Sequence, residues 1–492
     1  MIILLLLIIP VITATACVFI KNHNISKYVS IAGSFLALIY NIYLNYNIYT
    51  YHTIQGFNNF FYVDALTILT TQIVTIVAFA ASLYSAGYME AELHHGVISQ
   101  KKLAWYYFLL HMFIFTMLLV CVINNLGVMW VAIEGTTLAT TFLVGFYNKK
   151  QHQEAAWKYI ILCSVGITLA LFGIILTYHS AKGVLGEIGY ALNWSDLRTV
   201  ADKFEPHLMK LAFLFVLVGY GTKAGLAPMH TWLPDAHSQA PSPVSALFSG
   251  VLINCSMYGI IRFHILTSKC VGSDYSCTLL MIFGLISVIV SIPFILVQKD
   301  YKRLLAFSSI EHIGFIALGI GFGGMYSVYG AELHTFNHAM TKALLFFCAG
   351  NLFLKYHTTE MESIRGIIRT TPITGTILAI GVFAITGTPP FNIFVSEFLV
   401  LAAGFSSGNL FTIIFACILI VCITLIFVGF IYNMYRMIFG APASDVPKGE
   451  ISKFNTAAML FLLFFVLIIS FYVPPLLREI LKDIYDIVRN AS

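Results

Sequence analysis

Apolar stretches long enough to cross a bilayer recur along the whole chain of 492 residues. A membrane-spanning helix needs roughly 20 mainly apolar residues, and short polar connections separate the stretches. The pattern predicts an all-α membrane protein with about fourteen transmembrane helices and no soluble domain. The predicted spans cover residues 2–20, 29–50, 65–84, 104–124, 127–147, 156–178, 208–226, 243–266, 278–298, 303–322, 326–354, 374–403, 410–438 and 456–477.

Two of these spans are interrupted by prolines. The seventh runs into YGTKAGLAPMHTWLPDAHSQAPSP, and the twelfth contains TGTPPFN. Proline breaks a helix, and such a break within a membrane is tolerated only where protein or a water-filled cavity satisfies the freed backbone groups. The breaks therefore predict interior sites in helices 7 and 12, with simple packing kinks as the alternative.

The two breaks occupy matching places in the chain. Lys223 and Glu397 are 174 residues apart, and so are Ala104 and Thr278, where spans four and nine begin. We therefore expect spans four to eight to recur as spans nine to thirteen. Because five is odd, the two copies have opposite orientations, an arrangement that points to a transport site near mid-membrane.

This repeat divides the chain into four predicted parts. Residues 1–103 form helices 1–3, and residues 104–266 form the first ion-channel repeat, helices 4–8. Residues 267–440 form the second, inverted repeat, helices 9–13, and residues 441–492 contain helix 14.

Composition agrees with a membrane protein: 59% of the residues are hydrophobic, only 10% are charged, and the mean hydropathy is +0.87. Soluble domains carry about 25% charged residues. Of the basic residues, 16 lie in the segments that follow odd-numbered spans and 9 in the segments that follow even-numbered spans. The positive-inside rule then places both termini outside the inner (cytoplasmic) membrane.

The nine cysteines are scattered without a CxxC pair or a Cys/His cluster, which argues against iron–sulfur ligation and structural zinc. Cys270 and Cys277 share a loop and are either a disulfide or free thiols. No phosphate loop, nucleophile triad or haem pair is present, so we expect neither a catalytic centre nor a cofactor.

Ionisable residues within spans are functional candidates because burying a charge there costs about 2.5–3.5 kcal/mol on the insertion scale. Glu134 lies deep in span five, Lys223 just before the first break, and Glu397 just after the second. A buried lysine can exchange its proton, and an approaching carboxylate can switch its charge. We expect Glu134 and Lys223 to pair, with a static ion pair as the alternative.

Spans ten and eleven add a row of titratable groups. His334, His338 and Lys342 recur every four residues and so line one helical face. Glu311 and His312 stand in the preceding span. Histidine titrates near neutral pH, which suits a proton relay; metal ligands and satisfied core histidines are the alternatives.

Around the first break, Asp235, His230 and His237 either line a cytoplasmic mouth or cap the broken helix. Arg262 and His264 are expected to mark the outer end of span eight.

The segment HTWLPDAHSQAPSPVSALFSGVLINCSMYG resembles the signature of the antiporter-like subunits shared by respiratory complex I, Mrp-type sodium/proton antiporters and energy-converting hydrogenases. The likeness extends from span three to span thirteen. Within this superfamily, EAAWKYIILCSVGITLALFG and SSIEHIGFIALGIGFGG are similar to the hydrogenase-4 component F type.

The resemblance implies fourteen helices with two inverted half-channels. It assigns proton or ion translocation to the span-five glutamate, the span-seven lysine, the span-ten and span-eleven groups and the span-twelve glutamate. These residues are Glu134, Lys223, Glu311, His312, His334, His338, Lys342 and Glu397. Two departures stand out: Asn254 occupies the place of a channel lysine in the complex I fourth-chain type, and the chain ends at Ser492 without the long lateral helix of the fifth-chain type.

The expected function is proton or sodium translocation by a membrane subunit of a hydrogenase-4/formate hydrogenlyase-like complex. The expected partners are the bilayer, other membrane subunits and a peripheral [NiFe]-hydrogenase-like electron-transfer module, with no nucleic acid and no metal. The alternatives are an Mrp-type or complex I fourth-chain-like antiporter subunit, and a non-pumping membrane anchor.

Overall fold

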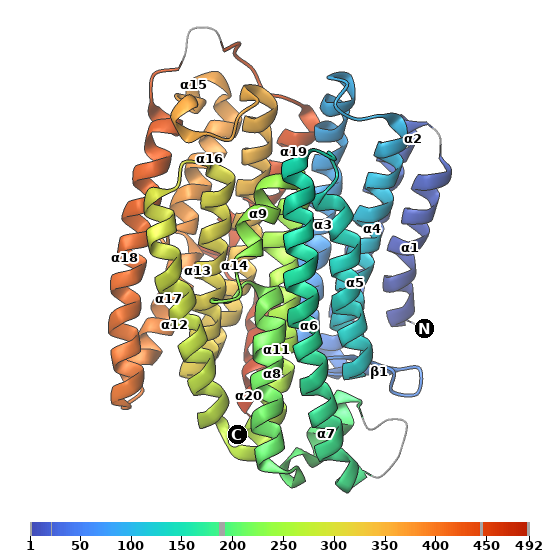
Figure 1. Cartoon of the computed structure of the whole chain (residues 1–492), viewed down its shortest axis with the longest axis vertical. Helices are drawn as coiled ribbons and strands as arrows, with labels where there is room; N and C mark the ends of the chain where they lie inside the picture. The colour runs from blue at the N-terminus through green and yellow to red at the C-terminus, as the bar shows by residue number, and fades with distance from the viewer. Residues whose placement is uncertain (1, 21, 186–191, 443–445, 490–492) are drawn as a thin grey trace.

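The computed structural model describes residues 2–20, 22–185, 192–442 and 446–489. Long helices run side by side along the longest axis of the molecule (Figure 1). Among the described residues, the helices are α1 Ile2–Phe19, α2 His23–Tyr51, α3 Ala65–His94, α4 Gln100–Val122, α5 Leu126–Val144, α6 Lys150–Leu185, α7 Trp194–Val200, α8 Pro206–Ala224, α9 Trp232–Gln239, α10 Ser242–Leu247, α11 Ile253–Val271, α12 Ser273–Val297, α13 Tyr301–Phe322, α14 Gly324–Tyr356, α15 Ile367–Thr370, α16 Pro372–Ile385, α17 Asn392–Ser406, α18 Leu410–Phe439, α19 Lys453–Phe471 and α20 Pro475–Arg489.

Three short helical segments and one hairpin complete the described chain. A π-helical turn, η2 (Phe248–Leu252), joins α10 to α11. The other two segments, η1 (Ala201–Lys203) and η3 (Met361–Ser363), are 3-10 turns. The hairpin pairs β1 (Ile54–Gly56) with β2 (Phe61–Val63) in antiparallel register. The sequence pattern did not predict this hairpin.

The predicted all-α membrane fold is confirmed. Each of the fourteen predicted apolar stretches contains at least one helix. Eleven helices in the described chain are long and apolar enough to cross a membrane. The count of fourteen spans is not established by that criterion: α8 and α14, which carry buried polar residues, do not meet it, and α16 and α17 are shorter.

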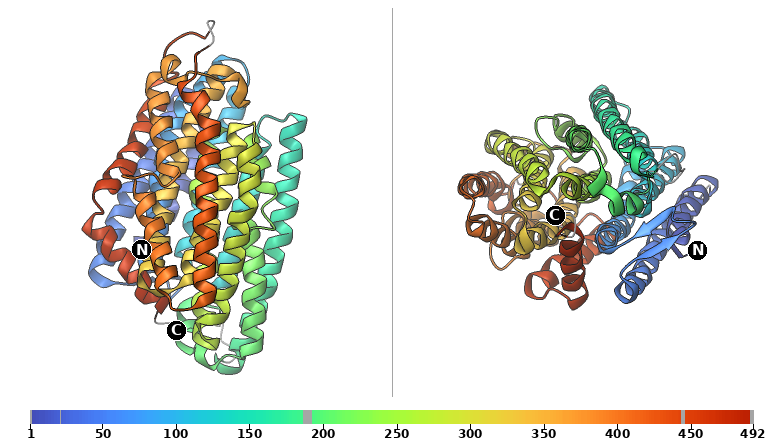
Figure 2. Two further views of the ribbon diagram at one scale, coloured as in Figure 1. Left: turned by 90° about the vertical axis from the view of Figure 1, so that its left-hand side faces the viewer. Right: turned by 90° about the horizontal axis from the view of Figure 1, so that it is seen from below.

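Both described ends of the chain lie at the end of the bundle that carries the hairpin (Figures 1 and 2). Ile3 of α1 lies against Gly56 of β1, and the Asp483 carboxylate of α20 is 3.7 Å from Nδ1 of His52. The two termini therefore share a side, while their placement outside the membrane stays a prediction. We call the opposite end, which carries the α5–α6 connection and the start of α13, the basic end. One of its sixteen expected basic residues, Lys21, lies outside the described residues.

The first predicted break separates α8 from α9, and protein groups satisfy the freed backbone. Gly225 ends α8 in the left-handed conformation (φ +85°), which glycine adopts without steric cost. Trp232 Nε1 donates to the Thr222 carbonyl at 2.8 Å, and the Ala227 N–H donates to Ser287 Oγ at 2.8 Å. The break is thus a built feature of the interior and not an unsatisfied kink.

The second break separates α16 from α17. Gly387 adopts φ +64°, and the Thr388 N–H donates back to the Phe383 carbonyl at 3.1 Å. The N–H of Asn392 donates to Ser470 Oγ of α19 at 3.2 Å. Both predicted interruptions are confirmed.

The repeat is visible in the helix starts. The helices α12, α13 and α14 begin at Ser273, Tyr301 and Gly324, which is 173–175 residues after α4, α5 and α6 begin. The broken pair α16–α17 and the helix α18 begin 160–168 residues after α8, α9 and α10, so the constant spacing is not kept beyond the third helix of each copy. The four-part division of the chain stays a prediction.

The residues assigned to the last predicted part contain more than one helix. After α19 the chain turns at Pro474 and Pro475 into the amphipathic helix α20, which the apolar pattern did not predict. Its buried residues Leu481, Ile484 and Val488 face the bundle, where α20 packs on α14 and α3.

Candidate functional site

Lys223 stands in the last turn of α8, immediately before the first break, and its side chain is fully buried. Its ammonium group donates to Thr137 Oγ1 of α5 at 2.9 Å and to the Tyr159 hydroxyl of α6 at 2.5 Å. The ammonium nitrogen also lies 4.7 Å from the centroid of the Tyr159 ring, a cation–π contact. Neutral oxygens and an aromatic face therefore hold this lysine.

Glu134 is half-buried on α5, one turn before Thr137. Ser164 Oγ of α6 donates to Glu134 Oε1 at 2.7 Å, and Thr137 Oγ1 donates to Oε2 at 3.2 Å. Thr137 therefore accepts from Lys223 and donates to Glu134. The expected Glu134–Lys223 pair is joined through this hydroxyl and not by a direct ion pair. We call Glu134, Thr137, Tyr159, Ser164 and Lys223 the first cluster.

Histidines on two helices meet in the second half of the bundle. His312 Nδ1 of α13 lies 3.0 Å from His334 Nε2 of α14, and His334 Nδ1 lies 2.9 Å from Ser396 Oγ of α17. Ser396 directly precedes Glu397. A continuous hydrogen-bonded row thus leads from α13 to the helix that follows the second break.

The remaining predicted groups on α13 and α14 surround this row. Glu311 Oε2 lies 3.3 Å from His312 Nε2. The ring of His338 lies 5.0 Å from the His312 ring between centroids, and neither His338 nitrogen has a hydrogen-bond partner in the described chain. Lys342 Nζ donates to the Leu305 carbonyl at 2.8 Å and to Ser308 Oγ. We call Glu311, His312, His334, His338, Lys342, Ser396 and Glu397 the second cluster.

The Glu397 carboxylate fills the space beneath the second break. A Cβ atom added to Gly387 would lie 2.1 Å from Glu397 Oε2. Glycine is thus required at this position both for its positive φ and for the close approach of the carboxylate. The backbone of the break and the acidic side chain form one unit.

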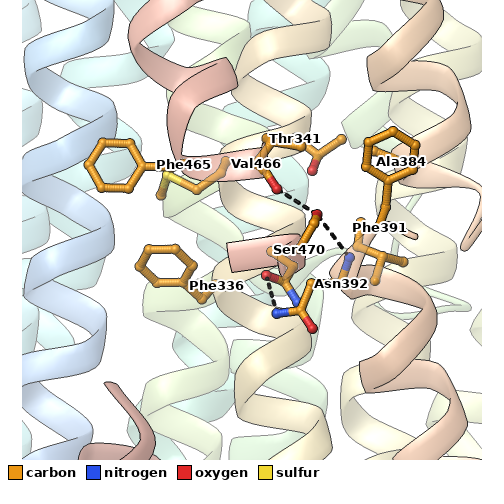
Figure 3. Close-up of a pocket in the computed structure, with 11 residues that line it drawn as sticks. Phe336, Thr341, Ala384, Phe391, Asn392, Phe465, Val466 and Ser470 are labelled. Carbon is orange, nitrogen blue, oxygen red and sulfur yellow. Dashed lines mark hydrogen bonds between the residues drawn. The ribbon is translucent and has the colours of Figure 1, made fainter. Parts of the chain in front are cut away.

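A small cavity of about 10 Å³ adjoins the same break (Figure 3). Asn337 and Thr341 of α14, Asn392 of α17 and Ser470 of α19 supply its polar lining. Asn392 Nδ2 donates to Asn337 Oδ1 at 3.4 Å, and Asn337 Nδ2 has no partner in the described chain. The cavity is large enough for roughly one water molecule, and its lining offers that water several polar partners. The second break therefore provides a place for water beside α14.

The basic end has a wider polar opening next to the first break. A pocket of about 260 Å³ is lined by residues of α6, α9 and α13. The Asp235 carboxylate of α9 lies there 3.3 Å from Lys158 Nζ and 3.0 Å from Arg303 Nη1. Asp235 thus ties three helices together at a solvent-open mouth, while His237, two residues further along α9, is fully buried.

At the hairpin end, Arg262 forms a buried bidentate ion pair that the sequence pattern did not reveal. Its guanidinium donates to both Asp64 oxygens at 2.6 and 2.7 Å and lies 4.1 Å from the Trp194 ring centroid. Burial raises the pKa of Asp64, but the Arg262 guanidinium and hydrogen bonds from Thr67 outweigh this and hold that pKa below its ordinary value. The two partners are 198 residues apart, so spacing alone could not pair them.

Asn254 and the two loop cysteines, Cys270 and Cys277, can also be placed. Asn254 Nδ2 donates to the Gly250 carbonyl of η2 at 2.8 Å, and its Oδ1 has no partner in the described chain. Gly250 touches the backbone of α14, since an added Cβ would lie 2.9 Å from the Ala339 carbonyl oxygen. Cys270 and Cys277 are free thiols.

Comparison with known proteins agrees with this geometry. Residues 123–424 match the family described as the NADH:quinone oxidoreductase/Mrp antiporter transmembrane region, and residues 56–95 match the N-terminal region of complex I chain 5. The chain is 36% identical over 462 residues to a hydrogenase-4 component F homolog of Methylacidiphilum infernorum, covering 94% of each protein. It is 30% identical over 346 residues to hydrogenase-4 component B of Escherichia coli, covering 68% of this chain and 49% of that protein.

Solved structures show the same fold at low identity. A chain of the membrane-bound sulfane sulfur reductase, an archaeal respiratory membrane complex, superposes with a TM-score of 0.86 at 21% identity, covering 99% of this chain and 97% of that one. A chain of the Mrp complex of Dietzia sp. superposes with a TM-score of 0.83 at 17% identity, covering 99% and 96%. The chain therefore belongs to the NADH:quinone oxidoreductase/Mrp antiporter family of membrane subunits.

Proposed function

We propose that this chain translocates protons or sodium ions as the antiporter-like subunit of a hydrogenase-4/formate hydrogenlyase-like complex. Electron transfer in partner subunits, including a [NiFe]-hydrogenase-like module, drives the movement. The likeness to a hydrogenase-4 component F homolog over 94% of both chains supports this type of complex. The location we propose is the inner membrane, with both termini outside.

One observation carries the proposal: two buried lysines, Lys223 and Lys342, lie among other buried polar and ionisable side chains near the two helix breaks. Lys223 is linked to a carboxylate through Thr137, and Lys342 lies on the helix that also carries His338 and His334. A static structural pair would gain most from direct contact between charges. A hydroxyl between lysine and carboxylate instead lets small shifts strengthen or weaken their attraction, which changes the protonation of the lysine.

The proposed path has two parts. In the first cluster, motion of Glu134 toward Lys223 favours the ammonium form, and its withdrawal favours release of the proton. In the second cluster, the proton passes between Lys342, the histidine row and Glu397. The water-sized cavity beside the second break supplies a hydration site next to α14.

The test uses the intact complex in sealed vesicles, driven by its own electron-transfer reaction. A pH-sensitive dye reports protons, and ²²Na⁺ reports sodium in parallel. Lys223→Ala and Glu134→Gln are compared with Lys203→Ala, which removes an exposed lysine. We expect ion movement to be lost in the first two variants and kept in the third, with the subunit assembled in all.

Unchanged ion movement in Lys223→Ala would overturn the proposal and favour a membrane anchor. A hydrogenase module in the purified complex supports the hydrogenase-4 type. A complex containing only other antiporter subunits would identify the Mrp type instead.

A further inference from the structure

A second set of buried ionisable residues lies below the surface of the basic end. Glu92 belongs to the last turn of α3, Lys302 to the first turn of α13, and His237 to α9. Glu92 and Lys302 are each 3% exposed, and His237 is fully buried. None of the three belongs to the clusters described above.

Glu92 lies close to the connection between α5 and α6. Its carboxylate interacts electrostatically with the exposed Lys149 and lies beside the hydroxyls of Tyr88 and Tyr147, which are 3.5 Å apart. Glu92 Oε2 has no hydrogen-bond partner in the described chain. One oxygen of this buried carboxylate is therefore without a hydrogen-bond partner in the described chain, close to the α5–α6 connection that carries Tyr147 and Lys149.

Lys302 is the second member of this set. Its ammonium nitrogen lies 3.5 Å from the Ala240 carbonyl at the end of α9 and 5.1 Å from the Phe353 ring centroid. A cation is favoured at a helix C-terminus. Lys302 interacts electrostatically with Glu92 and with Asp300, but no carboxylate in the described chain lies within ion-pair distance of its ammonium group.

His237 connects this set to the second cluster. Neither of its ring nitrogens has a hydrogen-bond partner in the described chain. Its ring interacts electrostatically with both Lys302 and Lys342, and His338 in turn interacts with His237. His237 lies three residues before Ala240, which accepts from Lys302, and its ring stacks on Phe346, one turn after Lys342 on α14. The imidazole therefore adjoins the segments that carry or contact both lysines.

An aromatic wall separates His237 from the first cluster. The Phe248 ring centroid lies 5.7 Å from that of His237 and 6.0 Å from that of Tyr159, whose hydroxyl holds Lys223. On its other side, His237 stacks on Phe346 of α14 at 5.1 Å. The route through His237 therefore leads to Lys342 and not to Lys223.

A purely structural role explains this arrangement poorly. An unsatisfied buried polar atom costs about 1–3 kcal/mol, and both Glu92 and His237 carry such atoms. Direct pairing of Glu92 with Lys302 would remove part of that cost. Acids and bases that stand in a row without direct partners instead allow intervening water molecules to carry a proton from one group to the next.

We propose that Glu92, Lys302 and His237 form a proton inlet from the basic end to Lys342 and His338. The inlet rests on the proposed function, because it supplies the second cluster of that same path. The Glu92 carboxylate takes a proton from external water and becomes neutral. Through bridging water, the proton then passes to the neutral amine of Lys302 and from there to the neutral imidazole of His237. It finally reaches the neutral amine of Lys342. Each group returns to its unprotonated form when it passes the proton on and can accept the next one.

The test measures electron-driven proton movement by the intact complex in sealed vesicles. The inlet variants are Glu92→Gln, Lys302→Met, Lys302→Arg and His237→Gln. Lys299→Met, which removes an exposed lysine three residues before Lys302, is the matched control. Lys342→Ala and Lys223→Ala serve as references for the proposed function.

Lys302→Arg separates a proton carrier from a fixed cation, since arginine keeps the charge but does not release its proton in proteins. We expect every inlet variant, including Lys302→Arg, to slow proton movement by about tenfold or more, corresponding to about 1.4 kcal/mol. Lys299→Met is expected to match the wild type. Subunit content and thermal stability of each complex are measured in the same preparations.

Three results would overturn the inlet. The first is normal proton movement in His237→Gln and Lys302→Met while Lys342→Ala and Lys223→Ala are inactive, which leaves the proposed function standing. The second is full activity of Lys302→Arg, which makes Lys302 a structural cation. The third is normal movement in every variant, references included, in which case the proposed function fails together with the inlet.

Discussion

Thr137 offers the sharpest test of how the first cluster works, because its hydroxyl is the only link seen between Lys223 and Glu134 in the described chain. Thr137→Val keeps the shape of the side chain and removes the hydroxyl. Thr137→Ser keeps the hydroxyl and removes a methyl group. The two substitutions therefore separate the hydrogen bond from the packing.

The expected magnitude follows from the bonds that are lost. The Lys223 Nζ–Thr137 Oγ1 bond is 2.9 Å long and involves a charged donor when the lysine is protonated. Hydrogen bonds to charged groups contribute about 1.5–3 kcal/mol, and about 1.4 kcal/mol is a factor of ten. If the hydroxyl couples the two groups, Thr137→Val should slow ion movement by roughly tenfold to a hundredfold.

The assay records electron transfer and ion movement together in sealed vesicles. We expect Thr137→Val to lower the number of ions moved per electron and Thr137→Ser to stay close to the wild type. A double-mutant cycle of Thr137→Val with Glu134→Gln should be strongly non-additive, since both changes break the same linkage. Equal pumping by Thr137→Val and Thr137→Ser, or additive effects in the cycle, would refute the coupling through Thr137.

Two further predictions concern the second break and the hairpin end. Gly387→Ala places a Cβ against the Glu397 carboxylate at φ +64° and should impair ion movement. Gly408→Ala is the control: it has a similar φ of +69° but open space around it, so it should add only local strain of about 1–2 kcal/mol. Equal pumping in both variants would contradict the role of the contact with Glu397. Asp64→Asn leaves the Arg262 guanidinium buried without its charge partner and should destabilise the subunit by about 3–5 kcal/mol in thermal unfolding of the detergent-solubilised complex. Because the pKa of folded Asp64 lies below its ordinary value of about 3.9, this stabilisation is fully present above that pH and is lost as the pH falls through the lower folded-state pKa; an unchanged melting temperature in Asp64→Asn would show that the pair contributes nothing.

Much of the architecture was predictable because the bilayer imposes strict rules on sequence. Apolar length located the helices, and the prolines around Lys223 and before Glu397 located both breaks. The cost of intramembrane charge also singled out Glu134, Lys342 and the histidines. Each of these signals is local in sequence, so it can be recognised in a single amino-acid sequence.

Features that depend on contacts between distant helices were not predictable. Four threonines lie between positions 136 and 141 of span five, and nothing in their spacing marks Thr137 as the link to Lys223. Lys302 sits at the start of a span and reads as an ordinary loop charge, yet it is buried. His237 could be read as lining a mouth or capping a helix, and the structure shows a buried ring whose two nitrogens have no hydrogen-bond partner in the described chain.

Short elements were missed for a different reason. The helix α20 is amphipathic and too short to register as a span, so apolar length could not reveal it. The β1–β2 hairpin has strands of three residues each, below the length at which alternation is informative. Both elements lie at the hairpin end, where the chain leaves the regular helical pattern.

The central claim is that the buried lysine clusters carry the transported ion. It is tested most directly by the number of ions moved per electron pair, measured in sealed vesicles containing the wild-type or the Lys342→Ala complex. We predict that Lys342→Ala removes the part of this number that this subunit contributes, while the subunit remains assembled in the complex. The same number of ions per electron pair in both complexes would contradict the claim and leave the lysine with a structural role.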